Sequence, residues 1–273
     1  MTMKNIIPCL LIAGLLSACS KKKDAGPDNA PDEKMVSRLM YDADTLQVIY
    51  HADGSVKQFK QYGQNQGFTP DSTQVLYENG NIARFRIWAM GELRDDRSFQ
   101  YNGERQLVKI NYYNMVSPTE LAVTDKDSIV YKQGKAAELH VINGTIRNEV
   151  YKLAWEKDNV SEVGHFLVIG GEEVLYRSTK LTYNDKAALH RSFPTYLLFL
   201  LSNTSRDFTA LSANTPLKEE TSEHPGPTPV EQVTYEYVYN DKGELEKIKT
   251  KTETLPGGQT DIVNTGIAYI PVQ

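Results

Sequence analysis

The chain has 273 residues, of which 40% are hydrophobic and 24% are charged, and its formal net charge is −5 at pH 7. This composition excludes disorder of the whole chain, and the acidic balance offers no attraction to the phosphate backbone of a nucleic acid. Both cysteines, Cys9 and Cys19, lie in the first 19 residues, so the rest of the chain forms neither a disulfide nor a thiolate metal site.

Residues 1–18 have the layout of a secretory signal peptide. A positive charge at Lys4 precedes an uncharged, mostly apolar run over 5–16, and Leu16-Ser17-Ala18-Cys19 follows. The run is too short for a transmembrane helix, which needs roughly 20 apolar residues. The last four residues resemble the lipobox of bacterial lipoproteins at every position. This resemblance implies cleavage before Cys19 and lipid on its sulfur, and two or three acyl chains anchor a protein firmly in a membrane. The alternative is an ordinary secreted protein with a chance cysteine.

Residues 19–35 predict a flexible, lipidated tether. Within it, residues 20–33 include three lysines and two prolines but no large apolar side chain, so this stretch cannot form a core. Ser20 follows the lipidated cysteine, and in enteric lipoproteins a residue other than Asp there implies transfer to the outer membrane. We therefore expect a cell-envelope protein, lipid-anchored in the outer membrane, and leave open whether its body faces the periplasm or the cell surface.

Residues 36–273 contain a recurring pattern in which a β-rich run ends in an aromatic residue, a short polar turn follows, and a second β-rich run returns. The aromatic anchors recur every 24 to 30 residues, with one double interval before the last; they are Tyr50, Tyr77, Tyr101, Tyr131, Trp155, Tyr183 and Tyr239. Asn, Asp and Gly in the turns supply the left-handed backbone of tight hairpins.

Side-chain alternation indicates that each repeat forms about two strands. Val233, Tyr235 and Tyr237 fall on one face, with Thr234 and Glu236 on the other, and a period of two is the spacing of a strand. The predicted fold class is mainly β: a large curled antiparallel sheet of consecutive repeat hairpins, a meander of a dozen or more strands, with one short buried helix covering its concave face.

An insertion at about 187–231 replaces one repeat. The run 193–201 is apolar on all sides and has Ser192 and Pro194 placed as a helix start, so it predicts a short buried helix. The polar, proline-rich stretch 218–229 predicts an exposed loop. Since one helix fills the concave face, residues 36–273 should form a single domain. The side chains expected to be mostly buried are Tyr196, Leu197, Phe199, Leu200 and Leu201.

The stretch Tyr239-Asn-Asp-Lys-Gly-Glu-Leu-Glu-Lys-Ile248 resembles YD/RHS-type repeats, in which an aromatic residue, an Asn/Asp-Gly turn and a returning aliphatic strand define the unit. With the lipobox and the helical part of the insertion, which ends in Leu211-Ser-Ala-Asn-Thr-Pro216, the chain looks most like uncharacterised Bacteroidetes-type lipoproteins built from degenerate repeats of this kind. The resemblance covers about 36–272 and implies fold and location, without an activity.

No local motif predicts catalysis, a metal site or a cofactor. The five histidines, His51, His140, His165, His190 and His224, are at least 25 residues apart, so no local metal pair exists, although a site assembled in space stays open. Adjacent acids occur at 95–96 and 172–173, but neighbours on a strand face opposite ways. The acid pairs 42/44 and 125/127 lack the glycine and the closing glutamate of a calcium loop, and we interpret them as turn acids.

The expected function is non-enzymatic: a membrane-anchored binding or scaffold protein of the envelope, whose partner is a glycan, a peptide or another envelope protein. A hydrolase acting on envelope polymers through spatially assembled carboxylates is the alternative. Exposed repeat aromatics would favour ligand stacking, and buried ones a structural core. Thr45, Ser72 and Ser128 also resemble acceptors of the Asp-Ser/Thr-apolar O-glycosylation motif of Bacteroidetes.

Overall fold

The computed structural model describes residues 34–42, 44–63, 71–117, 120–191, 193–202, 206–226 and 228–271, without the side chains of 115–117. The chain divides into the units 1–32 and 33–273. The second unit holds every described residue and is the subject below. The signal peptide, Cys19 and nearly all of the tether lie outside the described residues.

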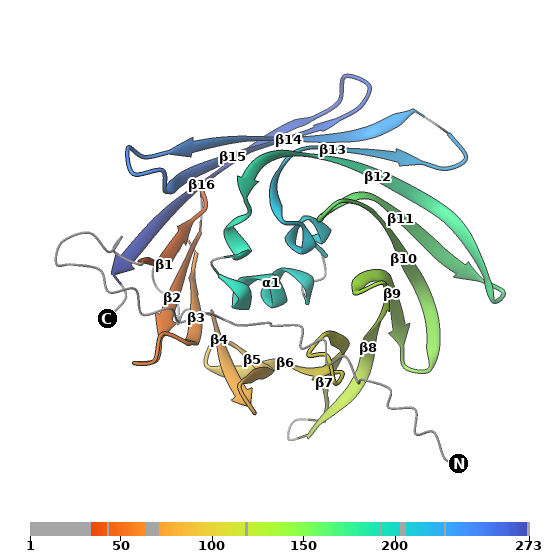
Figure 1. Cartoon of the computed structure of the whole chain (residues 1–273). Helices are drawn as coiled ribbons and strands as arrows, with labels where there is room; N and C mark the ends of the chain where they lie inside the picture. Colours follow the sequence, from red (N-terminus) through yellow and green to blue (C-terminus); the bar gives the residue numbers. More distant parts are fainter. Residues whose placement is uncertain are drawn as a thin grey trace, which may run out of the picture. The chain divides into compact units, whose positions relative to one another are not determined.

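The second unit is a closed antiparallel barrel in which each strand pairs with its neighbours in the chain (Figure 1). The predicted curled meander is confirmed, and its two ends also join: β1 pairs with β16 from Lys34↔Pro271 to Met40↔Gly266. The strands are β1 (Lys34–Met40), β2 (Thr45–Tyr50), β3 (Val56–Tyr62), β4 (Asp71–Glu78), β5 (Asn81–Ala89), β6 (Glu92–Tyr101), β7 (Leu107–Ser117), β8 (Glu120–Lys132), β9 (Lys135–Asn143), β10 (Ile146–Glu156), β11 (Asn159–Ile169), β12 (Glu172–Ala187), β13 (Asn214–Glu223), β14 (Pro229–Tyr239), β15 (Leu245–Thr254) and β16 (Thr260–Pro271).

Turn chemistry explains how the hairpins close. Asn79 and Gly80, between β4 and β5, both have positive φ, at 52° and 77°. Gln133 and Gly134 repeat this geometry between β8 and β9, at 54° and 77°. Two consecutive left-handed residues match the twist of the flanking strands, and glycine adopts such a backbone without steric cost.

Five of the seven aromatic anchors, together with Tyr237 and Tyr269, connect one hairpin to the previous one. A register shift in the strand pairing lies beside Tyr50, Tyr77, Tyr101, Tyr131, Trp155 and Tyr239. Such a bulge re-aims the side chain of the bulged strand. Seven aromatic side chains, here called the aromatic staples, donate a hydrogen bond to a backbone carbonyl near the start of the preceding strand. The pairs, with lengths of 2.5 to 3.0 Å, are Tyr50 to Val36, Tyr77 to Val56, Tyr101 to Ile82, Tyr131 to Leu107, Trp155 to Ala136, Tyr237 to Pro216 and Tyr269 to Leu245.

These aromatics are therefore structural. All of the staples except Tyr77 are partly buried against the hydrophobic core, while Tyr77 is 37% exposed. Burial raises the pKa of Tyr50 and of Tyr101 to about 12, which keeps the hydroxyl protonated as the donor that the carbonyl needs. The repeat aromatics consequently offer no row of free rings to a ligand.

Two sequence predictions around the insertion are wrong. The turn expected after Tyr183 does not form, because β12 continues to Ala187 and pairs irregularly with β13 there. The loop expected at 218–229 is also wrong, since β13 extends to Glu223 and occupies a place in the sheet between β12 and β14. Only 224–228 connects the two strands.

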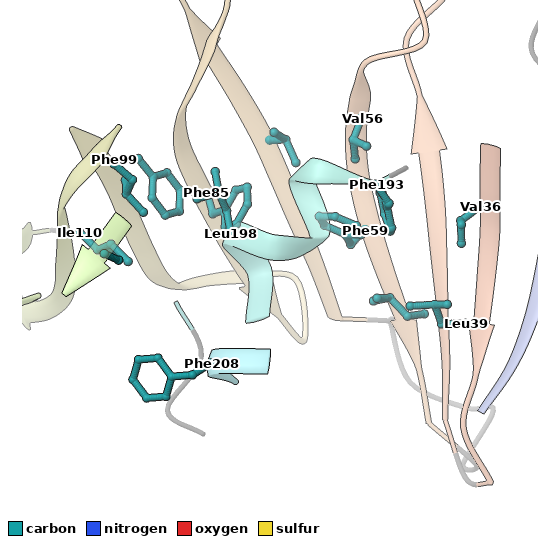
Figure 2. Packing of buried hydrophobic residues seen from close by; sticks show 14 of the residues in the cluster. Val36, Leu39, Val56, Phe59, Phe85, Phe99, Ile110, Phe193, Leu198 and Phe208 are labelled. Atoms are coloured by element: carbon teal, nitrogen blue, oxygen red, sulfur yellow. The ribbon is translucent and has the colours of Figure 1, made fainter. Parts of the chain in front are cut away.

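The described residues of the segment 188–213, which are 188–191, 193–202 and 206–213, are here called the plug and lie inside the ring of strands (Figure 1). It contains the 3-10 turn η1 (Leu189–Arg191), the helix α1 (Pro194–Leu201) and the 3-10 turn η2 (Phe208–Leu211). Pro194 begins α1 as predicted, because the missing proline N–H is not needed in the first turn. Figure 2 shows Phe193 and Leu198 among Phe59, Phe85 and other wall residues of the core.

The helix prediction is confirmed in place and in part for burial. Leu201 is buried at 2% exposure, and Thr195 and Leu198 are buried as well. Tyr196, Leu197, Phe199 and Leu200 are half-buried. Each of these four residues borders a cavity between the plug and the wall: Tyr196 and Leu200 line one, Leu197 a second and Phe199 a third.

Candidate functional site

A group of polar and aromatic side chains lines the lumen on β10, β11 and β12. We call Glu149, Tyr151, His165, Tyr176 and Arg177 the lumen cluster. It faces inward, since the ring of Tyr151 lies 5.0 Å from that of Phe208 in the plug. Strand pairing explains the grouping, because Tyr151↔His165 and His165↔Arg177 are direct partners across neighbouring strands, and such partners share one face.

Glu149 holds this cluster together. Its Oε2 accepts a hydrogen bond from the Tyr151 hydroxyl at 2.8 Å and lies 2.9 Å from Nε2 of His165. The rings of Tyr151 and His165 stack at 4.4 Å between centroids and 11° between planes. Burial lowers the pKa of His165 although Glu149 opposes this shift. The imidazole is therefore neutral at pH 7, and its Nε2–H donates a hydrogen bond to the Glu149 carboxylate.

Tyr176 and Arg177 extend the cluster along β12. The Tyr176 ring meets the His165 ring edge-on at 5.6 Å, and the Arg177 guanidinium lies 4.9 Å above the Tyr176 ring. Arg177 also forms an ion pair with Glu223, and its side chain stays 45% exposed. The cluster therefore combines a shaped aromatic surface with a cation and carboxylates that solvent reaches.

A buried ion pair fixes the plug beside this cluster. Arg206 of the plug donates to both carboxylate oxygens of Asp127 on β8, at 2.9 and 3.1 Å from its Nη2. The Tyr112 hydroxyl donates to the same carboxylate at 2.7 Å. The side chains of Asp127 and Arg206 are 1% and 14% exposed. The guanidinium lies 5.8 Å from the Tyr151 ring centroid, so this pair connects the plug, the wall and the lumen cluster.

The structure separates the acids that adjoin in the sequence. Asp95 pairs with Arg97, whose guanidinium also donates to the backbone oxygen of Ser202 in the plug. Asp96 turns to the outer face and pairs with Arg84. The expectation that such neighbours are poor acid–base couples agrees with this geometry. The interpretation of Asp127 as a turn acid is wrong, because it lies within β8 and is fully buried.

The remaining predicted residues are dispersed. Cys19, the predicted lipidation site, lies outside the described residues. Thr45, Ser72 and Ser128 lie on three separate strands and are half-buried. Within the described part of the chain, no group of three His, Cys, Asp or Glu side chains is arranged to hold a metal ion. Helices long and apolar enough to cross a membrane are also absent from these residues.

Sequence reasoning did not find the lumen cluster. Its members come from three strands and share no short motif. In addition, Tyr176 is the extra residue of a bulge, because His165 pairs with Arg177 and Phe166 with Leu175. The one available signal was the density of aromatic residues, which did not distinguish the staples from the lumen cluster.

The barrel resembles solved structures at low sequence identity. A porin-like protein from Bacteroides uniformis matches with a TM-score of 0.53 and 10% identity, over 86% of this chain and 96% of that protein. A porin-like protein from Bacteroides vulgatus matches with a TM-score of 0.39 and 14% identity, over 86% and 98%. No family model and no curated protein matches the chain. At such identities the likeness to the first protein concerns the fold alone, and the lipoprotein and YD/RHS resemblances stay predictions.

Proposed function

We propose that the protein is a lipid-anchored binding protein of the bacterial envelope, which holds a glycan at the lumen cluster without chemically changing it. The observation that carries this proposal is the half-exposed set of rings and charges on a concave wall. Binding sites for small ligands are typically concave, with aromatic surface and a few fixed polar groups. The ring faces suit the C–H faces of a sugar, and Arg177, Glu149 and Glu223 suit its hydroxyls.

The predicted anchor and the barrel surface support the same location. The lipobox resemblance at Cys19 implies attachment through acyl chains. The outer barrel face carries ion pairs between neighbouring strands, such as Lys132–Glu138 at 2.9 Å and Lys249–Glu236 at 3.0 Å. Charged pairs are typical of a surface in water and costly on one that faces lipid, which favours a tethered body. The porin-like description of the Bacteroides uniformis protein favours an envelope setting.

The proposal is tested by glycan-array binding with the mature lipoprotein in detergent micelles. Tyr176→Ala should abolish binding, because it removes the ring between His165 and Arg177. Phe166→Ala is the matched control: Phe166 is adjacent to His165 on β11, and the outward Lys152 lies 4.6 Å from its ring. This variant should bind as the parent does.

Four results would contradict the proposal. If the protein bound no glycan on the array, glycans would be excluded as its ligands. If it bound peptides on an array and Tyr176→Ala abolished that signal, the ligand would be an extended peptide. Equal binding by both variants would place the site elsewhere. Release of shortened glycans during the assay would favour the hydrolase that the sequence left as an alternative.

A further inference from the structure

A cavity lies between the plug and the part of the barrel wall formed by β1 and β13 to β16. Its volume is about 190 Å³. Leu39, Leu189, Leu200, Leu245 and Ile248 give it an apolar body. An apolar protein cavity of roughly 150 Å³ accommodates a benzene ring, so the space suits a compact molecule of that size or slightly larger.

Carboxyl groups mark one side of this cavity. Asp207 of the plug lines it, and Glu219 on β13 lies beside it, bonded to the hydroxyl of the lining residue Tyr235. Burial raises the pKa of both carboxyls, that of Glu219 to about 7, and the charge of Asp207 adds to the shift of Glu219. Both residues are half-buried, and Asp207 itself lines the cavity.

Neither carboxyl has an ion-pair partner among the described residues. The neighbouring cations are engaged elsewhere. Arg206, next to Asp207 in sequence, binds Asp127, and Lys218, next to Glu219, pairs with Glu220 at 2.9 Å. His190 lines the cavity, but burial lowers the pKa of its imidazole. Asp207 accepts hydrogen bonds from the backbone N–H and the hydroxyl of Thr209, but no described cation pairs with either carboxyl. Above a pH of about 7 the cavity therefore presents negative charge without a counter-ion, and a buried charge of this kind favours an incoming cation.

Tyrosines form much of the remaining lining, and their hydroxyls are already used. Tyr237 donates to the carbonyl of Pro216, Tyr235 donates to Glu219, and the hydroxyls of Tyr41 and Tyr196 bond to each other at 3.0 Å. What they still offer to a ligand is ring surface, and aromatic faces attract ammonium groups.

We propose that this cavity binds a small organic ammonium ion, with its charge at Asp207 and Glu219 and its apolar body against the leucines and tyrosines. An anion would be repelled by the carboxylates. A bare metal ion would lack ligands, since the described residues provide no group of three metal-binding side chains. The cavity is separate from the lumen cluster, so either proposal can fail without the other.

Calorimetric titration of the mature lipoprotein in detergent micelles tests this inference. The probes are 2-phenylethylammonium and the neutral 2-phenylethanol, which share a ring and a chain length. The ammonium ion should bind saturably at about pH 8.5 and at least tenfold more weakly at about pH 5.5, because Glu219 becomes protonated in this interval. Glu219 titrates among Asp207, Glu231, Tyr235 and the nearby His190. The alcohol should bind at least tenfold more weakly than the ammonium ion at the higher pH.

Matched variants locate the charge. Glu219→Gln keeps the shape of the side chain and an acceptor for Tyr235, and it should reduce ammonium affinity at least tenfold. Glu220→Gln changes the adjacent residue, which pairs with Lys218, and should leave affinity unchanged. If Glu219→Gln does not fold, as judged by near-ultraviolet circular dichroism, Asp207→Asn replaces it, since an amide oxygen still caps η2.

The inference is overturned by any of three results: equal affinity for the ammonium ion and the alcohol, no saturable binding of the ammonium ion at about pH 8.5, or parental affinity in the folded carboxyl variant.

Discussion

Removing the charge of Asp127 should destabilise the protein strongly. Asp127→Asn keeps the size of the side chain but leaves the Arg206 guanidinium, 14% exposed, without its counter-ion. Breaking one side of a buried ion pair typically costs about 3–5 kcal/mol. For a chain of this size, 1 kcal/mol corresponds to roughly 2–4 °C in melting temperature. The expected loss is therefore about 6–20 °C in thermal unfolding followed by circular dichroism.

Two comparisons make this prediction specific. Glu92→Gln breaks the Arg94–Glu92 pair, whose side chains are 53% and 68% exposed, and should cost less than about 1 kcal/mol. Replacing both buried partners, Asp127→Leu with Arg206→Met, should recover most of the stability, because no unpaired charge remains. The reasoning would be refuted if Asp127→Asn melted within about 2 °C of the parent, or if the double variant lost the sum of both single losses.

Three further predictions concern the staples, the helix and pH. Tyr101→Phe should lower the free energy of unfolding, measured by chemical denaturation, by about 1 kcal/mol, since the carbonyl of Ile82 loses its donor. Tyr62→Phe should be nearly neutral, because the exposed Tyr62 hydroxyl bonds only a side chain. Equal effects of the two variants would count against a structural role of the staples. Leu201→Ala should lower the free energy of unfolding by roughly 2–5 kcal/mol, and Leu200→Ala should lower it less, because Leu200 is half-buried. A larger loss in Leu200→Ala would contradict the packing of the plug. The folded-state pKa of Glu219, about 7, lies above its ordinary value. The folded state therefore binds more protons than the unfolded state, and the free energy of unfolding should fall as pH rises from about 4.5 to 7. Glu219→Gln should flatten this pH dependence relative to Glu220→Gln, and an unchanged slope would argue against a titrating Glu219.

The sequence predicted the hairpins well because their determinants are local. An Asn79-Gly80 turn between alternating strands specifies its own geometry, and Pro194 before an apolar run specifies a helix start. The closure of β1 on β16 could not be predicted, since it depends on pairing between residues such as Lys34 and Pro271, which share no local signal.

The wrong prediction of a loop at 218–229 has an identifiable cause. Strand β13 places Glu219 and Thr221 toward the lumen, so its inward face is polar and its sequence lacks the apolar alternation of the other strands. The assumption that side chains pointing into a barrel are apolar fails wherever the interior contains a cavity. For the same reason the lumen cluster was overlooked, although every one of its residues was visible in the sequence.

Closure of the ring also limits how the molecule can change in size. In an open solenoid, a unit gained or lost at one end alters only the length. Here, adding one hairpin would increase the circumference of the barrel and change the tilt of every strand. The plug would then lose contacts with the walls that it now touches. The paired β1–β16 seam leaves no free edge for another chain to extend. Duplication or deletion of a unit should therefore be tolerated only together with a matching change in the volume of the plug.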